Sequence, residues 1–422
     1  MNRTAWLIVS CALLTLACAG NAADWPQWRG PNRDDVSQES GLLKEWPKEG
    51  PKLLWTCEEA GIGFSGPAIV GDRLYSMGSD DKKEYIFAID VKNGKKLWST
   101  EVGELFTNMF GDGPRGTPTV DGDLVYALGS NGDLICVKAA SGEKVWSVSL
   151  KKDFEGQVGH GWGFCESVLI DQDKLICTPG GKKGALLALD KKTGKEIWRT
   201  KDLEDPASSA SIITTTVAGK RHYVQMTQKG VVGVSPEDGR VLWHFPREGR
   251  TAAIPTPIAK DHFVYVVSGY GAGSQLLDLA VAGDKFEPKS LYDKDKHKNM
   301  DNKHGGVVRV GDYLYGFCDG KGWVCQKFDS GDIVWPDSER HKLGHGSLTY
   351  ADGHLYCYHD KGTIAVIEAS PDGWKESGRF DLPKKSSYKR KGSAIWTHPV
   401  VANGKLYLRD QDLIFCFDIK AP

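Results

Sequence analysis

Three histidine–glycine pairs are the most chemically suggestive feature of this sequence. They are His160-Gly161, His304-Gly305 and His345-Gly346, and each stands just before a segment that is interpreted below as a β-strand. Imidazole nitrogens suit both small-ligand binding and metal coordination. Other polar or aromatic residues occur at similar places, so the full candidate set is Asp112, Arg115, His160, Trp162, Glu166, His304, His345, Trp396 and His398.

Two interpretations of this candidate set remain open. If the residues gather at one place, they form a polar, aromatic-edged pocket that could hold a small ligand or a metal ion. Alternatively, the side chains hydrogen-bond to neighbouring structural units and fill a narrow channel with water. No pair has the close local spacing of a typical metal-binding motif, so we predict no metal site. No serine nucleophile elbow or paired-carboxylate motif stands out either, and we therefore predict no catalytic residue.

A short repeat must position these residues. Its clearest copy, Ala188–Trp198, reads Ala-Leu-Asp-Lys-Lys-Thr-Gly-Lys-Glu-Ile-Trp. The small residue and the alternating apolar residues end one strand, Asp190 and Thr193-Gly194 form a tight turn, and a second strand presents the tryptophan. Four further copies keep the small residue ten positions, and the glycine four positions, before the tryptophan: Ala88–Trp98, Cys136–Trp146, Gly233–Trp243 and Cys325–Trp335.

The turn signals divide the chain into eight repeats of roughly 40 to 50 residues, a length typical of one four-stranded propeller blade. A single sheet of this kind cannot bury both of its faces, so the sheets must stack. We therefore predict an all-β fold, an eight-bladed β-propeller of four-stranded antiparallel blades. The fifth repeat is degenerate, with Phe286 about where the tryptophan is expected. If this repeat is not a full blade, the propeller has seven blades.

The two ends of the chain are predicted to close the ring. Lys52–Thr56 is a strand that carries Trp55 without a repeat in front of it, whereas the last repeat ends at Leu413–Asp418 without its tryptophan strand. Pairing these two strands completes the last blade and removes exposed sheet edges. The expected role of the repeat tryptophans is stacking between blades; they are Trp55, Trp98, Trp146, Trp198, Trp243 and Trp335.

The 422 residues divide into three predicted segments. Residues 1–22 have the positive start, short apolar run and small residues of a secretory signal peptide, with cleavage before Ala23. Residues 23–50 are aromatic and proline-rich and should form an extended arm, and residues 51–422 should form a single propeller domain. No later apolar run is long enough to span a bilayer. A lipid anchor is an alternative, because the residues before Cys18 approximate a lipobox.

Charge and cysteine content narrow the class of protein. The net charge of -1 leaves no basic excess for nucleic-acid binding. Cys11 and Cys18 lie in the leader, which leaves eight of the ten cysteines in the mature chain. Export permits disulfides, but several cysteines occupy the repeat position that alanine or glycine fills elsewhere, so most should be free and buried. We expect a monomer.

The signature Ala-x-Asp-x-x-Thr-Gly-x-x-x-Trp, complete at Ala188–Trp198, resembles the repeat of pyrroloquinoline-quinone-type (PQQ-type) β-propellers. That family includes the quinoprotein alcohol dehydrogenases and the outer-membrane assembly lipoprotein BamB, which shares the fold and binds no quinone. The resemblance covers nearly all of the mature chain and implies the propeller fold. The enzymes carry a vicinal cysteine pair beside the cofactor and a calcium ion held by Glu, Asn and Asp. No two cysteines are adjacent here, and the calcium ligands have no residue-by-residue match.

The chain is therefore more similar to the compact, BamB-like members. We predict an exported, non-catalytic binding or scaffold protein of the cell envelope, without a cofactor, whose partner is an envelope protein or a small ligand. A PQQ-dependent alcohol or aldehyde dehydrogenase, with quinone and calcium, is the alternative. A third hypothesis is a carbohydrate-binding or sugar-acting propeller that uses Trp162 and Trp396 as platforms.

Overall fold

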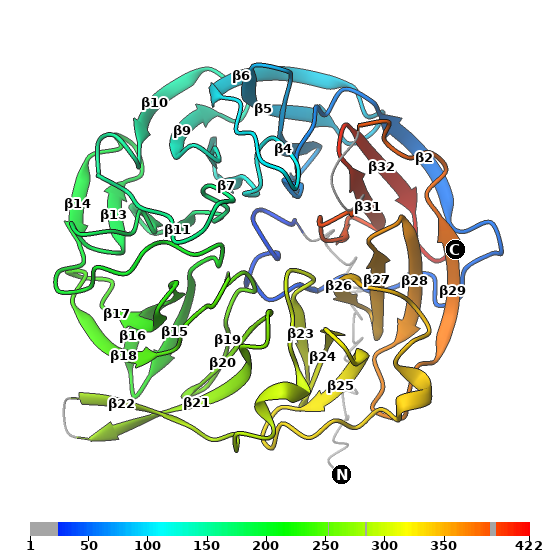
Figure 1. Cartoon of the computed structure of the whole chain (residues 1–422). Helices are drawn as coiled ribbons and strands as arrows, with labels where there is room; N and C mark the ends of the chain where they lie inside the picture. Colours follow the sequence, from blue (N-terminus) through cyan, green and yellow to red (C-terminus); the bar gives the residue numbers. More distant parts are fainter. Residues whose placement is uncertain (1–23, 252, 283–284, 389–393) are drawn as a thin grey trace, which may run out of the picture.

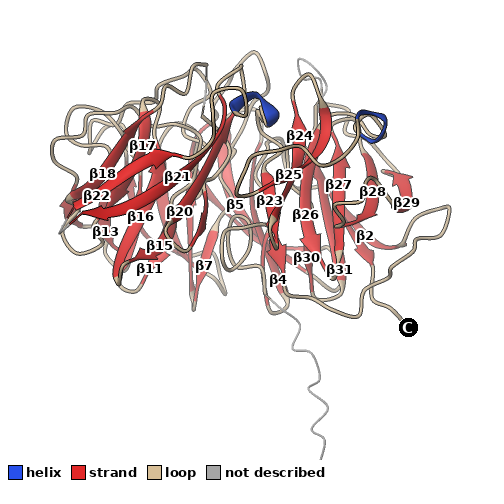
Figure 2. Cartoon of the chain, turned by 90° about the horizontal axis from the view of Figure 1, so that it is seen from below, coloured by secondary structure: helices blue, strands red, loops and turns tan. Residues whose placement is uncertain are grey.

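Eight sheets are arranged around a central channel as the blades of a ring (Figure 1). The computed structural model describes residues 24–251, 253–282, 285–388 and 394–422, and the signal peptide predicted over residues 1–22 lies outside this part. Seen from the side, the ring is a thick disc whose strands run between its two faces (Figure 2). The prediction of an all-β, eight-bladed propeller is confirmed, and the seven-bladed alternative is wrong.

Blades 1 to 4 each contain four antiparallel strands, and strands adjacent in sequence are adjacent in the sheet. Blade 1 comprises β3 (Ala68–Val70), β4 (Arg73–Ser79), β5 (Lys83–Asp90) and β6 (Lys96–Glu104). Blade 2 comprises β7 (Thr119–Asp121), β8 (Leu124–Leu128), β9 (Asp133–Lys138) and β10 (Lys144–Ser149). Blade 3 comprises β11 (Leu169–Asp171), β12 (Lys174–Cys177), β13 (Leu187–Asp190) and β14 (Glu196–Arg199). Blade 4 comprises β15 (Ile213–Val217), β16 (Lys220–Met226), β17 (Gly230–Val234) and β18 (Val241–Pro246).

Blades 5 to 8 follow the same plan with local changes. Blade 5 comprises β19 (Ile258–Lys260), β20 (Phe263–Ser268), β21 (Gly273–Ala282) and β22 (Lys285–Ser290). Blade 6 comprises β23 (Val307–Val310), β24 (Tyr313–Cys318) and β25 (Gly322–Lys327), and its fourth strand is reduced to a bridge between Gln326 and Ile333. Blade 7 comprises β26 (Gly346–Ala351), β27 (His354–His359), β28 (Thr363–Glu368) and β29 (Glu376–Asp381), with β1 (Val36–Ser37) added parallel to β26. Blade 8 comprises β30 (Val400–Ala402), β31 (Lys405–Asp410), β32 (Leu413–Asp418) and β2 (Lys52–Cys57).

Two short 3-10 turns, η1 (His297–Asn299) and η2 (Asp337–Glu339), are the helices of the described residues. No helix in this part of the chain is long and apolar enough to cross a membrane.

The repeat unit folds as its residue types predict. The carboxylate of Asp190 accepts hydrogen bonds from the backbone N–H groups of Lys192 and Thr193, at 3.1 and 2.8 Å, and so closes the turn. Gly194 adopts a φ of 71°, which residues with a side chain rarely adopt. The turn then returns the chain as β14, the outermost strand of blade 3.

Five of the six repeat tryptophans connect their own blade to the next one. The indole N–H donates to a backbone carbonyl of the following blade, at 2.9 to 3.2 Å, in Trp55, Trp98, Trp146, Trp198 and Trp335. The ring of Trp55 also covers the next turn at Gly94, where an added Cβ would lie 2.7 Å from the indole. Trp243 differs, because its indole N–H donates to His222 Nδ1 within its own blade, at 3.0 Å.

Blade 5 makes the equivalent contact with a tyrosine. Phe286, which we expected about where the tryptophan stands, packs edge-on against His222 of blade 4, with ring centroids 4.5 Å apart. Tyr292, just after β22, instead reaches blade 6: its hydroxyl donates to the backbone carbonyl of Phe328 at 2.6 Å. Its ring also covers the turn at Gly331. The contact between blades 5 and 6 therefore depends on Tyr292.

Blade 7 obtains its aromatic anchor from the N-terminal segment. The residue opposite Val366, where most other blades carry tryptophan, is Gly378. Trp46 fills the space beside it, because a Cβ on Gly378 would lie 2.7 Å from the Trp46 Cβ. The ring of Trp46 contacts Tyr356 and Phe380, with centroid distances of 5.8 and 5.3 Å.

Buried apolar side chains of the described residues form eight clusters, one at each contact between neighbouring blades. The core is therefore a closed series of layers between blades. The eight cysteines of the described residues are free, and seven of them are buried, in line with the expectation from their repeat positions.

The ends of the chain close the ring as predicted. Strand β2 pairs antiparallel with β32, and Trp55 lies opposite Cys416. The first strand after the N-terminal segment thus completes the last blade. The free edges of β2 and β32 pair with each other and are no longer exposed.

The N-terminal segment enters the central channel before it reaches the ring (Figure 1). Residues 27–35 form tight turns there, with positive φ at Arg29 and Arg33, and so differ from the extended arm that we expected. Both guanidinium groups are buried and donate to the surrounding blades. Arg29 donates to Val307 O of blade 6 at 2.7 Å, and Arg33 donates to Ser167 O of blade 3 at 2.5 Å. The segment therefore fills the channel and connects these blades from the inside.

Candidate functional site

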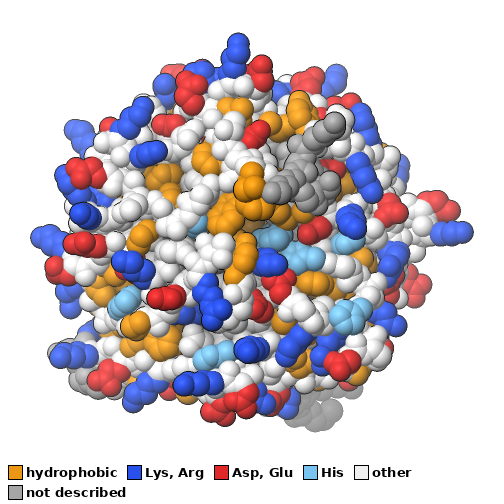
Figure 3. Space-filling view, in the orientation of Figure 1, with side chains coloured by type: hydrophobic (Ala, Val, Ile, Leu, Met, Phe, Trp, Pro, Cys, Tyr) orange, Lys and Arg blue, Asp and Glu red, His pale blue; other side chains and the backbone are white. Residues whose placement is uncertain are grey.

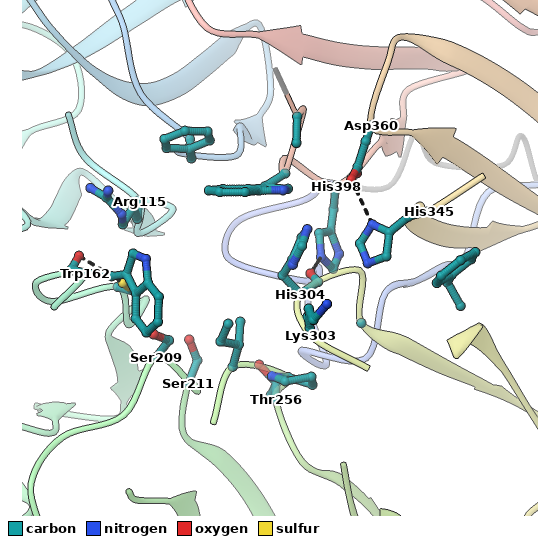
Figure 4. A pocket seen from close by; sticks show the side chains of 18 of the residues that line it. Arg115, Trp162, Ser209, Ser211, Thr256, Lys303, His304, His345, Asp360 and His398 are labelled. Atoms are coloured by element: carbon teal, nitrogen blue, oxygen red, sulfur yellow. Dashed lines mark hydrogen bonds and ion pairs between the residues drawn. The ribbon is translucent and has the colours of Figure 1, made fainter. Parts of the chain in front are cut away.

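A pocket of about 700 Å³ opens at one mouth of the channel. The loops before the inner strands meet at this mouth, because the inner strands of all blades start there. Hydrophobic and histidine side chains gather at the centre of this face (Figure 3). The pocket has an aromatic side and an imidazole–carboxylate side, which Figure 4 shows from close by.

The aromatic side is built by blades 1, 2, 3 and 8. Phe64 and Trp396 stack with ring centroids 5.1 Å apart, and Phe110 contacts Trp162 at 5.8 Å. The guanidinium of Arg115 lies 5.5 Å from the Phe64 centroid and donates to two backbone carbonyls of its own loop, at 2.6 and 2.7 Å. Burial lowers the pKa of Arg115. An aromatic wall with a fixed cation suits a flat, partly apolar ligand that carries negative charge.

His304, His345 and Asp360 form the other side (Figure 4). One potential metal-ligand atom of each residue lies within 4.8 Å of the other two. His345 Nδ1 lies 2.9 Å from Asp360 Oδ2, and the two imidazole centroids are 4.5 Å apart. Burial, together with the neighbouring His345, Lys303 and His398, holds the pKa of His304 well below its usual range. The His304 imidazole is therefore neutral at physiological pH and can act as a ligand.

Glycine explains why His304 and His345 are neighbours. A Cβ on Gly305 would lie 2.0 Å from the carbonyl oxygen of Gly346, so the two backbones approach more closely than a side chain would permit. The close approach places the two preceding histidines side by side, at the starts of blades 6 and 7.

The N-terminal segment closes the floor of the pocket. The Trp28 ring lies 4.6 Å from His398. His398 Nδ1 lies 3.0 Å from Asp35, whose carboxylate also lies 2.9 Å from Arg29 Nε. His398 Nε2 lies 3.2 Å from the backbone carbonyl of His304. Both nitrogens of His398 are thus engaged by the protein, and this residue supports the floor.

The pocket brings together six of the nine predicted residues, namely Arg115, Trp162, His304, His345, Trp396 and His398. The other three lie outside its lining. Asp112 accepts a hydrogen bond from a backbone N–H of its own loop at 2.9 Å. His160 Nε2 lies 3.0 Å from Ser209 Oγ, and burial lowers the pKa of His160 to about 4. Glu166 is only 2% exposed, and its carboxyl group accepts hydrogen bonds from Thr178 inside the protein.

The two lining carboxylates were not predicted from the sequence, because only the segments before the inner strands were considered. Asp319 follows β24 and Asp360 follows β27, so they hold the same position in adjacent repeats. A comparison of the repeats at the end of the second strand could have found both. Trp28 and Arg29 lie in a segment without a repeat, where no such signal exists.

The pocket does not fit the calcium–quinone arrangement that the PQQ-type resemblance implies. That arrangement has adjacent cysteines, whereas Cys165 is the single cysteine among the described lining residues. The lining carboxylates are Asp319, 3.3 Å from Lys303 Nζ, and Asp360, which faces His345. Neither is part of a group of Glu, Asn and Asp, and no reaction step is derived through a quinone.

Comparison with known proteins agrees with this fold. Residues 82–316 match the family model described as outer membrane protein assembly factor BamB. The chain is 26% identical to the outer membrane protein assembly factor BamB of Burkholderia pseudomallei (strain K96243) over 312 residues, which cover 62% of this chain and 74% of the relative. It is 24% identical to the same factor of Yersinia pestis over 400 residues, which cover 90% and 91% of the two chains. The crystal structure of quinohemoprotein alcohol dehydrogenase from Comamonas testosteroni superposes with a TM-score of 0.63 at 14% identity, over 95% of this chain and 82% of that one. This last likeness concerns the fold alone.

Proposed function

Because this chain belongs to the PQQ-like propeller family described as outer membrane protein assembly factor BamB, we propose that it is an exported, non-catalytic binding propeller of the cell envelope. Its pocket takes a small, flat and partly apolar ligand that carries negative charge. The observation that supports this proposal is the pair of aromatic contacts, Phe64–Trp396 and Phe110–Trp162, beside the cation of Arg115. The pocket volume of about 700 Å³ falls within the usual range of small-ligand sites.

The test is to identify the small molecules that the protein retains. Wild-type protein and the variant Trp162→Ala are purified from the native envelope and extracted for mass spectrometry. We expect a stoichiometric small molecule in the wild type and a loss of most of it in Trp162→Ala, because truncation removes one aromatic wall. The control is Leu97→Ala, which changes a side chain that is 48% exposed on the outer strand of blade 1. Identical extracts from all three proteins would contradict small-ligand binding and would favour a protein partner at the pocket.

Export has its own test. We expect the mature protein to begin at Ala23 and to be recovered in the envelope fraction, as N-terminal sequencing and fractionation would show. The variant Cys18→Ala should leave both results unchanged. A lipid-modified N-terminus that begins at Cys18, and that this variant abolishes, would establish the lipid anchor instead.

A quinone-dependent dehydrogenase is the second candidate, because the pocket lies at the mouth of a propeller that shares its fold with a quinohemoprotein alcohol dehydrogenase. Purified protein is mixed with the quinone and calcium, and the bound chromophore and the reduction of a dye by alcohols are measured. We expect neither, because the lining residues do not match that cofactor site. A stoichiometric quinone spectrum together with alcohol-dependent dye reduction would replace the proposed binding function by this enzymatic one.

A further inference from the structure

Three buried polar atoms without a hydrogen-bond partner lie together on the imidazole–carboxylate side of the pocket. His304 Nε2, His345 Nε2 and Asp360 Oδ1 are all buried and form no hydrogen bond with the described residues. Such atoms are rare in folded proteins because each one costs its desolvation free energy, and many of those that do occur bind an ion or a water molecule. Three of them on three adjacent side chains indicate that something beyond the described residues completes the cluster.

We propose that His304, His345 and Asp360 bind a divalent transition-metal ion, with Zn²⁺ as the best-fitting one. Two imidazoles with one carboxylate are a ligand set typical of zinc, whereas Mg²⁺ and Ca²⁺ prefer oxygen ligands alone. The inference goes beyond the proposed binding function, because the metal site exists whether or not the pocket takes a further ligand.

The geometry needs only a small adjustment to accept the ion. The potential ligand atoms, one from each residue, lie within 4.8 Å of one another. The contact of His345 Nδ1 with Asp360 Oδ2, at 2.9 Å, leaves His345 Nε2 and Asp360 Oδ1 free for an ion. A tetrahedral zinc ion with bonds of about 2.0 to 2.2 Å places its ligand atoms about 3.5 Å apart. Side-chain rotations that bring the most widely separated ligand atoms about 1 Å closer together would therefore form the site. Three protein ligands leave one coordination position open, and all three residues line the pocket.

The surrounding charges favour a cation. The neighbouring cation, Lys303, pairs with Asp319 at 3.3 Å and also lies 5.5 Å from the ring of Tyr270. Asp319 Oδ1 lies 3.9 Å from His345 Nε2 and adds a second carboxylate beside the cluster. Two carboxylates and one lysine therefore surround the two imidazoles. Neutral imidazole is the form that binds a metal ion.

Two other histidines near the pocket, His398 and His160, do not have these unpartnered nitrogen atoms. Both nitrogens of His398 are engaged, by Asp35 and by the backbone carbonyl of His304. His160 Nε2 lies 3.0 Å from Ser209 Oγ, and its Nδ1 accepts from the backbone N–H of Trp162. His160 therefore serves as a matched control, because it begins the same His-Gly motif in another blade without facing a cluster.

The test uses the full mature chain after treatment with a chelator, and Zn²⁺ alone as the probe. Equilibrium dialysis with metal analysis gives the stoichiometry, and calorimetry gives the affinity. We expect one zinc ion per wild-type chain and an affinity at least about tenfold lower in His304→Ala and His345→Gln, because each loses a ligand. Asp360→Asn should weaken binding in the same direction, and His160→Ala should bind as the wild type does.

Thermal melting of each variant in the absence of metal shows whether the variant is folded, so that lost binding can be distinguished from unfolding. If His304→Ala does not fold, His345→Gln and Asp360→Asn carry the test, since both preserve side-chain size. The proposal is overturned if the folded wild type binds no stoichiometric zinc. It is equally overturned if the affinity is unchanged in these two variants or falls only in His160→Ala.

Discussion

At the scale of single residues, burial determines the charge of the carboxyl groups behind the pocket. Glu166 is 2% exposed, and burial raises its pKa to about 8, against 4.5 for an ordinary glutamate. The backbone N–H and the hydroxyl of Thr178 donate to this carboxyl group at 2.7 and 3.0 Å, which favours its charged form. Burial outweighs these bonds, so the folded protein keeps Glu166 protonated at neutral pH.

This proton makes a testable contribution to stability. Between pH 4.5 and about 8, the unfolded chain has lost the Glu166 proton and the folded chain retains it. The unfolded state then binds fewer protons, so the free energy of unfolding falls as the pH rises, by about 1.4 kcal/mol per pH unit for this group. Glu166→Gln cannot ionise and should gain stability relative to the wild type over this range, as denaturant midpoints at successive pH values would show. Glu45→Gln, an exposed substitution, is the control, and a wild-type-minus-variant difference independent of pH would contradict the assignment.

The sequence predicted part of the candidate site because position in the repeat determines position in space. Arg115, Trp162, His304 and His345 precede inner strands, and the ring brings such segments to one mouth. Which side chains face the pocket depends on rotamers and on neighbouring blades, and these have no signature in a single repeat. Glu166 therefore stands at a correct repeat position but is buried and bonded to Thr178.

At the scale of the elements, the propeller tolerates the loss of a repeat tryptophan when another part of the chain supplies the contact. Blade 7 has Gly378 at that position, and Trp46 from the N-terminal segment packs beside it. Trp46 is 7% exposed and contacts Tyr356, a residue of β27, as Trp98 contacts Tyr75 of β4 in blade 1. The use of Trp46 in place of a repeat tryptophan could not be predicted from the sequence, because the segment around Trp46 carries no repeat.

We therefore expect Trp46 to contribute as much to the free energy of unfolding as a tryptophan within a repeat. We expect Trp46→Ala to lower the free energy of unfolding by about 3 kcal/mol or more, because a large buried ring is removed from between blades 7 and 8. Trp98→Ala provides the matched comparison from within a repeat, and calorimetry or denaturant unfolding measures both. A loss below about 1 kcal/mol in Trp46→Ala, with a large loss in Trp98→Ala, would show that the N-terminal segment only covers blade 7.

At the scale of the whole molecule, the ring has one interface at which the two ends of the chain meet. The fold could be predicted from the sequence because five copies of one spacing specify the blade, and the unmatched strand at each end specifies the closure. The turns that place residues 27–35 in the channel follow instead from contacts with several blades at once. Those contacts exist only after the ring has formed, so no local pattern in the sequence predicts them.

Arg409 secures this interface. It is fully buried in β31 and donates from blade 8 to the backbone carbonyls of Gly61, Ser65 and Met77, at 3.0, 2.7 and 2.6 Å. Its Nε also donates to Gln411 O at 2.8 Å. Burial lowers the pKa of Arg409 to about 10, which leaves the group charged at neutral pH. The guanidinium thus satisfies carbonyls on both sides of the closure.

Arg409→Leu should open the ring at the closure before any other interface. The substitution leaves several buried carbonyls without donors, and the expected loss is about 3 kcal/mol or more. The matched control is Arg247→Leu, because Arg247 is also buried and donates to Gly273 O, at 2.6 Å, between blades 4 and 5. Blades 4 and 5 remain joined by the chain when their contact weakens, whereas β2 is held to β32 only by non-covalent contacts. Hydrogen exchange should therefore accelerate in β2, β32 and blade 1 of Arg409→Leu, and only around blades 4 and 5 of Arg247→Leu. Equal acceleration throughout the ring in Arg409→Leu would mean that the propeller unfolds as one unit and that the closure is not its weakest interface.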